Sequence, residues 1–448
     1  MIRSFVSRFE SYLKNISWIL SEKVLRILAG LFIGVFVARH LGPEQFGSLN
    51  YALALSSFFA VATHMGLSGL VVRELVKKPS DAGLTMGTTF HIKAIMSVLT
   101  CLLFLVVATV TEQFASTEYW LLVLVSASIL LKPIEVLNFW FESKVQSRYS
   151  SLANMITLAS SSLLKIALVL FGAQLLSFAM VHVFEVLLVS LLIVYFYKSS
   201  SSVPFKEWNS SKEKAKIFLS QSWMILLGAL FATVYLKVDQ VMLKWLVSKQ
   251  EVGIYAVAAR LSEIWYFVPT AIVSSFFPRL IALKENQPEQ YLKRLQMLFD
   301  LLFVMAFILA IVVTLFSDPI ISLLYGPAYH KSSSVLAIHI WAGVFIFMRA
   351  ALSKWILTEN LLEFSLITQA SGAIFNVALN LLLIPRYQST GAAAATLISY
   401  GIASYFSLMI YKKSRSVFFM ITKSFFAPLR LTLNLAKDYW WEKQKTSA

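Results

Sequence analysis

"MGTTFHIKAIMSVLTCLLFLVVATV", residues 86–110, decides the fold class of this chain. Lys93 is the only Asp, Glu, Lys or Arg in this run of 25 residues. A helix rises about 1.5 Å per residue, so about 20 apolar residues are enough to cross the hydrocarbon core of a bilayer. The stretch is therefore predicted to be a transmembrane helix.

Similar apolar runs recur along the whole chain. The sequence is 58% hydrophobic and only 14% charged, whereas soluble domains carry about 25% charged residues. The fold class is therefore predicted to be an all-α polytopic membrane protein with about twelve transmembrane helices. The predicted spans are 16–38, which is taken as an uncleaved first span, and 46–69, 86–110, 119–141, 152–171, 175–197, 217–238, 252–277, 297–316, 334–357, 362–384 and 392–411.

The longest gap in the middle of the chain, 198–216, contains four consecutive serines and then a basic run. It predicts an N-terminal six-helix bundle over 1–197, a cytoplasmic linker over 198–216 and a C-terminal six-helix bundle over 217–411. The remaining 412–448 mixes apolar and basic residues around a proline. This tail is too interrupted to span and is predicted to be cytoplasmic and amphipathic, either lying on the membrane surface or having no specific task.

The positive charge of the chain follows the predicted topology. Of 39 Lys and Arg residues, 25 lie in the segments on the side of the N-terminus, five on the opposite side and nine within spans. Cytoplasmic loops of membrane proteins carry such an excess, so both termini are predicted to be cytoplasmic. Contact with anionic lipid headgroups also explains the net charge of +16. Binding to nucleic acid is therefore not needed to explain the charge and is not predicted.

A weak internal repeat relates the two halves at an offset of 206 residues. Gly47 corresponds to Gly253, and Arg73 corresponds to Arg279. Each glycine opens the second span of its half. The equal direction favours a parallel repeat, an arrangement on which some transporters are built.

Three ionisable side chains lie close together in the first span, in "SEKVLRILAGLF", residues 21–32. Glu22 and Arg26 are four residues apart, and Lys23 is three residues before Arg26, so all three can share one helix face. Arg26 lies about 15 Å into the span, where an unpaired charge is costly. One interpretation is an internal ion pair followed by a close helix contact through the glycines of "GLFIG". That interpretation leaves one positive charge over, and the alternative is that the cations face a water-filled cavity.

Other ionisable residues lie inside later spans. Arg260 is predicted to lie at a depth similar to that of Arg26, with Glu263 one turn away, and is interpreted either as lining a cavity or as pairing with Glu263. His182 and Glu185 are three residues apart, which fits a hydrogen-bonded pair or a proton relay. Four further cations can snorkel to the interface or face inward, and these are Lys93, Lys132, Lys165 and Lys354. Arg349 lies about two turns from its cytoplasmic end and could do either.

Lys and Arg outnumber acidic residues inside the predicted spans, where Glu22, Glu135, Glu185 and Glu263 lie, with Asp239 and Asp300 at span edges. Buried positive charge in excess needs an anionic partner, which favours an anionic substrate over a cationic one. The single Cys101 and the six histidines show no metal-ligand spacing. No metal or other cofactor is therefore expected.

Three stretches carry a family resemblance: "VARHLGPEQFGSLNYALALSSFF" (37–59), "KVDQVMLKWLVSKQEVGIYAVAARLSEIWYFVPTAIVSSFFPRL" (237–280) and "NVALNLLLIPRYQSTGAAAATLIS" (376–399). They resemble the O-antigen and polysaccharide flippases (Wzx-like), in the polysaccharide-transporter branch of the multidrug/oligosaccharidyl-lipid/polysaccharide (MOP) exporters. The resemblance covers nearly the whole chain, although some relatives have fourteen spans. It implies a MATE-like V of two six-helix bundles around a cavity that opens alternately to the two sides.

The resemblance further implies a flippase, not an enzyme, in the bacterial inner membrane. Its substrate would be an oligosaccharide on undecaprenyl diphosphate, such as an O-antigen or capsule repeat unit, and membrane lipids and the polysaccharide polymerase machinery would be its partners. Arginines and lysines would line the cavity, and the cations expected to bind substrate are Arg26, Arg260, Lys23, Lys165 and Arg349. A proton or sodium ion would couple transport through Glu22, Glu263 or Glu185.

Two other functions compete with this prediction. A MATE-like drug or cation antiporter would need an acidic cavity, which the excess of basic side chains disfavours. A membrane polysaccharide polymerase or glycosyltransferase would need catalytic residues in a sizeable loop. The longest outer gaps, 239–251 and 317–333, are short and carry no paired carboxylates or nucleotide-binding glycines.

Overall fold

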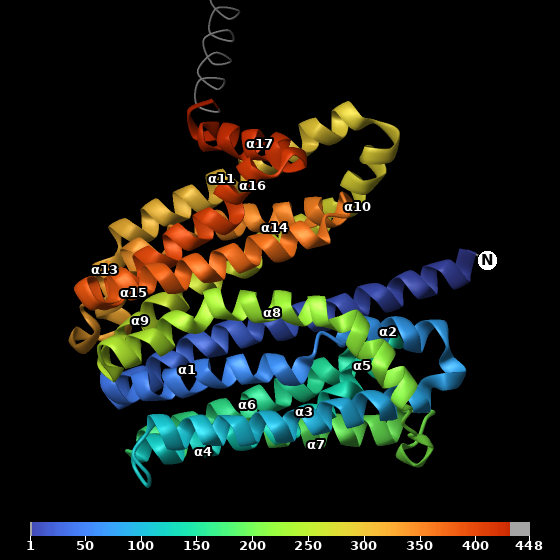
Figure 1. The fold of residues 1–448 in the computed structure, drawn as a ribbon, viewed down its shortest axis with the longest axis horizontal. Coiled ribbons are helices and arrows are strands. Elements are labelled where there is room, and N and C mark those ends of the chain that lie inside the picture. Colours follow the sequence, from blue (N-terminus) through green and yellow to red (C-terminus); the bar gives the residue numbers. More distant parts are fainter. Residues whose placement is uncertain (1, 431–448) are drawn as a thin grey trace, which may run out of the picture. The chain divides into compact units, whose positions relative to one another are not determined.

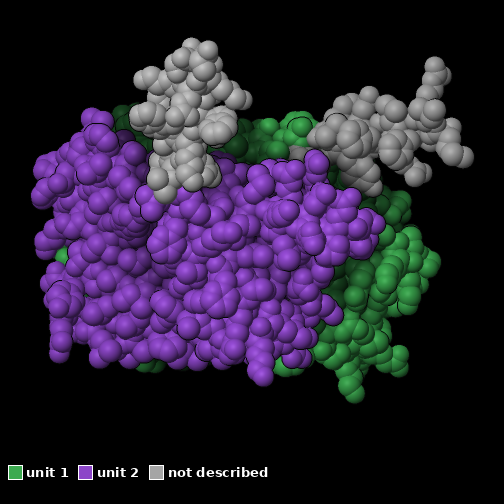
Figure 2. Space-filling view, turned by 90° about the horizontal axis from the view of Figure 1, so that it is seen from above, with its two compact units in different colours: residues 1–253 green, residues 254–448 purple. Residues whose placement is uncertain are grey.

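The computed structural model describes the backbone of residues 2–430, and within that range every regular element is a helix (Figure 1). Contacts between residues group the chain into two compact units, residues 1–253 and residues 254–448, which Figure 2 shows in two colours. We call them unit 1 and unit 2. The division falls after Gly253, so the 35-residue helix α8 (Lys212–Leu246) belongs by its contacts to unit 1. The sequence had placed the division in the linker 198–216.

In unit 1, α1 packs along α6 and α8, and α6 packs along α7 (Figure 1). Besides α8, its helices are α1 (Ile2–His64), α2 (Ser68–Lys77), η1 (Pro79–Asp81), α3 (Ala82–Thr111), α4 (Thr117–Ala127), η2 (Ser128–Glu135), α5 (Val136–Ser143), α6 (Arg148–Leu170), α7 (Leu175–Ser200) and η3 (Phe205–Glu207). Helix α9 (Lys249–Glu263) begins in unit 1 and ends in unit 2.

In unit 2, α11 packs against α10, α14 and α17, and α14 packs against α15. The elements are η4 (Ile264–Tyr266), α10 (Phe267–Asn286), α11 (Pro288–Leu315), α12 (Ser317–Tyr325), η5 (Pro327–Tyr329), α13 (Ser332–His339), α14 (Ala342–Thr358), α15 (Leu362–Gly401), the π-helical turn η6 (Ile402–Phe406), α16 (Ser407–Ile410), η7 (Lys412–Ser414) and α17 (Arg415–Phe425).

Ten helical segments of the described chain are long and apolar enough to cross a membrane. Two of them are too long for one crossing, because 61 residues (Ser17–Lys77) and 48 residues (Glu363–Ile410) would extend roughly 90 and 70 Å against a hydrocarbon core of about 30 Å. Each contains a residue with non-helical backbone angles, Gly42 (φ 70°) and Gln388 (φ 54°). Each therefore folds into two crossings, and the twelve predicted spans are confirmed.

The break in α1 follows from its sequence, because Gly42 adopts the left-handed region that glycine tolerates and Pro43 cannot donate a backbone hydrogen bond. Beyond this break, α1 meets the start of α9 backbone to backbone. A Cβ atom added to Gly47 would lie 1.8 Å from the carbonyl oxygen of Lys249, and one added to Gly253 would lie 2.0 Å from that of Pro43. The glycines that the repeat predicted to correspond thus face each other's helix, and only glycine fits at either position.

The segment 198–216, predicted as a linker, is folded onto the start of α3. The backbone N–H of Ser211 donates to Thr88 Oγ1 at 3.1 Å, and Lys214 Nζ donates to Thr85 Oγ1 at 2.7 Å. A Cβ atom on Gly87 would lie 2.3 Å from the carbonyl oxygen of Asn209. The segment is therefore part of the packed end of unit 1.

The first part of the tail, α17, is packed against α11 in unit 2. Its apolar side chains Val417 and Ile421 are buried. Asp300 of α11 accepts hydrogen bonds from Ser424 Oγ at 2.7 Å and from Arg430 Nη2 at 3.0 Å. Residues 431–448 of the predicted surface helix lie outside the described residues, so the membrane-surface interpretation stays a prediction.

We expect Asp300→Ala to loosen α17, because two donors of the tail and Gln296 of α11 would lose one shared acceptor. Hydrogen bonds to charged groups contribute about 1.5–3 kcal/mol each, so trypsin should cleave at Lys423 and Arg430 several-fold faster. The measurement is a digestion time course on purified protein. Asp318→Ala is the matched control, because Asp318 is exposed at the start of α12. Equal digestion rates for the two variants would contradict the expectation.

Candidate functional site

The charges of the first span form an ion pair plus one free cation. Arg26 Nε donates to Glu22 Oε1 at 2.8 Å, and the two residues are four apart on α1. Glu22 is buried, whereas the Arg26 side chain is 58% exposed. Lys23 is exposed and makes no ion pair or hydrogen bond within the described part of the chain. The leftover positive charge that the sequence indicated is therefore Lys23.

The close helix contact proposed for "GLFIG" is not made at its first glycine. A Cβ atom added to Gly30 would meet nothing within 4 Å. The first glycine of the motif therefore does not serve tight packing.

Lys165 of α6 and the pair of His182 and Glu185 on α7 form one cluster of side chains. Lys165 Nζ of α6 donates to Glu185 Oε1 of α7 at 2.7 Å. His182 Nδ1 lies 3.8 Å from Glu185 Oε2. About a quarter of each of these side chains is exposed, so the cluster is neutral when His182 is neutral and is reachable by water.

Arg260 in unit 2, like Lys23 in unit 1, has no partner for its charged group among the described residues. Among the described residues it makes no ion pair or hydrogen bond, including none with Glu263, and it is exposed. It lies within the candidate span Lys249–Asn286. The structural pair with Glu263 that the sequence left open is therefore absent.

The part of α9 that precedes Arg260 is buried within unit 2. Residues 254–259 are all buried. The Ile254 carbonyl accepts from Ser332 Oγ at 2.8 Å, and Tyr255 Oη lies 3.2 Å from Thr396 Oγ1. Arg260 follows directly after this buried stretch, so a fixed backbone presents a free guanidinium group.

Sequence reasoning missed Tyr325, which lies near Arg260. Its hydroxyl group is buried and has no hydrogen-bond partner. Burial raises the pKa of this hydroxyl to about 12, and the positive charge of Arg260 opposes that rise. Tyr325 ends α12 before Gly326, whose φ is 82°, and nothing in "LYGPAY" marks it as a neighbour of α9.

Arg349, the remaining predicted cation, joins three elements of unit 2. Its Nη1 donates to Thr368 Oγ1 of α15 at 2.9 Å and to the Ala403 carbonyl of the π-helical turn at 3.2 Å. Such turns are rare and frequent at functional sites. The contacts give Arg349 a cross-linking role within the unit.

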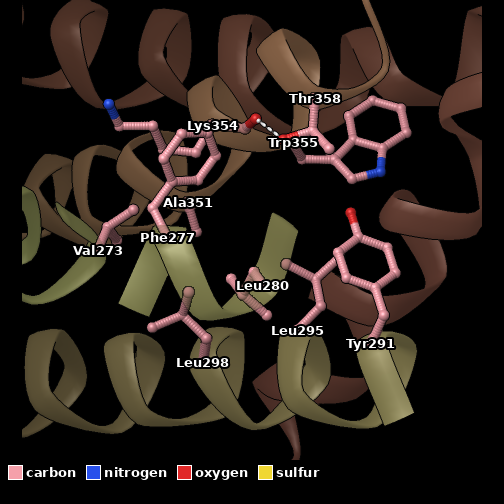
Figure 3. Close-up of a pocket in the computed structure, with 10 residues that line it drawn as sticks. All are labelled: Val273, Phe277, Leu280, Tyr291, Leu295, Leu298, Ala351, Lys354, Trp355 and Thr358. Atoms are coloured by element: carbon pink, nitrogen blue, oxygen red, sulfur yellow. Dashed lines mark hydrogen bonds between the residues drawn. The ribbon is translucent and has the colours of Figure 1, made fainter. Parts of the chain in front are cut away.

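A small cavity in unit 2 lies between α10, α11 and α14 (Figure 3). It measures about 10 Å³, which is room for one water molecule at most, so it holds no sugar. Lys354 on its wall places Nζ 4.9 Å from the ring centre of Phe277. The lining residues are Val273, Phe277, Leu280, Tyr291, Leu295, Leu298, Ala351, Lys354, Trp355 and Thr358.

Two lysines that the sequence placed near the interface turn inward instead. Lys93 of α3 has a side chain that is 0% exposed, which excludes snorkelling. Its Nζ lies 3.2 Å from Glu135 Oε2, and Lys132 Nζ lies 2.8 Å from Glu135 Oε1. The spacing of Lys132 and Glu135 was visible in the sequence, but the third member is 42 residues away from Glu135.

The ten apolar helical segments and the ionisable side chains buried among them define a multi-pass α-helical membrane protein with charged sites inside its helical units. The family model described as Polysaccharide biosynthesis protein matches residues 12–284, more than half of the chain. The chain belongs to this family. A second family model, MatE, matches residues 225–382.

The chain is also similar to named relatives and to solved structures. The chain is 25% identical to "Probable flippase AglR" of Haloferax volcanii over 87% of this chain and 81% of that protein. It is 21% identical to "Capsular polysaccharide biosynthesis protein CapF" of Staphylococcus aureus over 89% and 99%. Among solved structures, Lipid II flippase MurJ in an inward closed conformation matches with a TM-score of 0.68 at 13% identity, covering 95% of this chain and 93% of that one.

An inward-facing multidrug resistance MATE family transporter of the MOP superfamily matches with a TM-score of 0.67 at 13% identity, covering 89% and 96%. Identities this low show the fold alone. The predicted fold class, an all-α membrane protein of the MOP type, is confirmed.

Proposed function

We propose that this protein is a flippase that moves an oligosaccharide on undecaprenyl diphosphate from the cytoplasmic to the outer leaflet of a bacterial inner membrane. Family membership and the two named relatives support transport in polysaccharide synthesis. The excess of Lys and Arg in alternate segments supports cytoplasmic termini. Alternating access is the general mechanism of secondary transporters.

The observation that carries the proposal is the free guanidinium group of Arg260. A charged side chain in the middle of a membrane costs about 2.5–3.5 kcal/mol on insertion scales, so an unpaired one needs a ligand or water. A guanidinium group binds two phosphate oxygens at once and stays charged when buried. Arg260 on its buried helix therefore suits a diphosphate, and the free Lys23 in unit 1 is a second candidate ligand.

The proposed coupling uses a proton or a sodium ion. Glu22 and Glu185 are both engaged by cations, Arg26 and Lys165. Substrate phosphate that took either cation would release its carboxylate, which could then take up the ion; Glu263 is the third candidate. Flipping that is unchanged when both ion gradients are collapsed would overturn this part of the proposal alone.

The direct test is transport by the purified protein in liposomes. We expect a fluorescent undecaprenyl-diphosphate oligosaccharide on the inner leaflet to become accessible to an added glycosidase within minutes, and rhodamine 6G to stay where it is loaded. Empty liposomes are the control. Dye export without glycan flipping would instead favour the drug antiporter that the MatE match allows.

A further inference from the structure

Three basic side chains of unit 1, those of His64, Lys93 and Lys132, meet around the carboxylate group of Glu135. Glu135 accepts from Lys132 at 2.8 Å and from Lys93 at 3.2 Å, and His64 Nε2 lies 3.7 Å from Glu135 Oε2. Lys132 and Glu135 belong to η2, Lys93 to α3, and His64 is the last residue of α1. The cluster thus ties together three segments of the helical unit.

The backbone of η2 explains why two of these groups stack. Residues in a 3₁₀-helix that are three apart eclipse each other, and runs longer than three or four residues are uncommon. Here eight residues are 3₁₀, with Pro133 inside the run. The conformation brings Lys132 directly over Glu135, and a mid-helix stretch of this kind is typical of a hinge.

The charges of the cluster do not balance. Two ammonium groups share one carboxylate, so the net charge is +1, and it becomes +2 when His64 is protonated. The face of Phe139 helps to stabilise Lys93, with its ring centre 5.5 Å from Nζ. By contrast, the cluster of Lys165 and Glu185 has one lysine for one carboxylate.

An unsatisfied donor lies on the same face of α3. Ser97, one turn after Lys93, is 1% exposed, and its hydroxyl group has no partner. One turn further, Cys101 Sγ lies 3.6 Å from the Ser126 carbonyl of α4, so this face of α3 points toward the α4–η2 segment. A buried polar group without a partner is costly. The hydroxyl group of Ser97 can therefore donate a hydrogen bond to a bound ligand.

We propose that this cluster binds the phosphate oxygens of an isoprenoid diphosphate and that Glu135 is a built-in counter-ion which the substrate displaces. This proposal rests on the proposed function, because it assigns a second subsite to the same substrate. A diphosphate carries about two negative charges and several acceptor oxygens, so it replaces the single carboxylate with a better match to two lysines. Ser97 then gains an acceptor.

A ligand can reach the cluster through its partly exposed side chains. The side chains of Lys132 and His64 are 27% and 51% exposed, whereas the Lys93 side chain is fully buried. In the proposed topology, the connection between α1 and α3 is cytoplasmic, so the cluster lies on the side from which the substrate enters. Displacement of Glu135 would also release η2, which gives binding a means to start a conformational change.

The test is isothermal titration of purified full-length protein in detergent with farnesyl diphosphate. We expect Glu135→Gln to bind it about tenfold more tightly, because the competing negative charge is gone while an oxygen acceptor remains for the lysines. Lys132→Gln should bind it about tenfold more weakly, and Lys132→Arg should bind as the wild type does. Glu359→Gln is the matched control, because Glu359 forms a similar half-exposed pair with Lys284 at 2.7 Å and should change nothing.

Thermal melting of each variant separates a binding change from a folding failure. If Glu135→Gln does not fold, the two Lys132 variants still decide, because their side chain is partly exposed. Unchanged affinity in folded Glu135→Gln or in Lys132→Gln would overturn this inference and leave the proposed function standing. A wild-type protein that binds no farnesyl diphosphate would overturn both. Equal competition by phosphatidylglycerol would assign the cluster to phospholipid headgroups and overturn the inference.

Discussion

Replacement of Arg260 by alanine should reduce flipping by at least about a hundredfold and leave the amount of protein in the membrane unchanged. Arg260 is exposed and has no partner among the described residues, so its loss removes no hydrogen bond or ion pair within the described part of unit 2. Removal of a charged group that binds a desolvated anion typically costs several kcal/mol, and every 1.4 kcal/mol is tenfold. The measurement is initial flipping rate in liposomes, with abundance determined by immunoblotting of membranes.

Two further variants refine this result. Arg260→Lys should retain partial activity, because a point charge lacks the planar fork that holds two phosphate oxygens. Lys77→Ala, which removes an exposed cation at the end of α2, should flip at the wild-type rate. Wild-type flipping by Arg260→Ala at normal abundance would show that the guanidinium group does not bind the substrate.

Arg26 offers a less direct test because of its pairing. Its loss would leave the buried Glu22 without its cation. Arg26 is 58% exposed, so its pair contributes less than the roughly 3–5 kcal/mol lost when a fully buried pair is broken, but a drop in flipping by Arg26→Ala would still mix binding with stability. The free and the paired arginine thus need different experiments, although the sequence presented them alike.

The fold was largely predictable because hydrophobic runs of fixed length report spans directly. Two long helices are broken, at Gly42 and at Gln388. The sequence predicts both breaks, because a glycine-proline step interrupts the hydrophobic run of the first helix and a polar run interrupts that of the second. The site was predictable only within one helix. The pair of Glu22 and Arg26 follows from helical spacing.

Pairs between helices could not be predicted in this way. Lys165 meets Glu185 and Lys93 meets Glu135 across 20 and 42 residues of chain, and both contacts depend on the rotation of packed helices about their axes. Apolar spans leave that rotation undetermined, because they are hydrophobic on most sides. For the same reason, the sequence did not predict that Tyr325 lies near Arg260.

The glycine contact between α1 and α9 leads to the prediction with the largest expected effect on stability. Gly47→Ala places a Cβ atom 1.8 Å from the Lys249 carbonyl oxygen, and Gly253→Ala places one 2.0 Å from that of Pro43. Both obstacles are backbone, so the helices themselves must separate. Overpacking usually costs about 1–3 kcal/mol, and a backbone clash this close should exceed that range.

Each variant should therefore melt at a clearly lower temperature in detergent and accumulate poorly in membranes, and a valine at either position should not accumulate at all. The double variant should be less destabilised than the two single changes added together, because the helices have to move apart only once. Gly30→Ala is the matched control, since nothing lies within 4 Å of its Cβ position and alanine favours a helix by about 1 kcal/mol. A Gly47→Ala protein as stable as Gly30→Ala would mean that α1 and α9 do not touch at Gly47 and Gly253. The contact between the two glycines that correspond in the internal repeat would then be refuted.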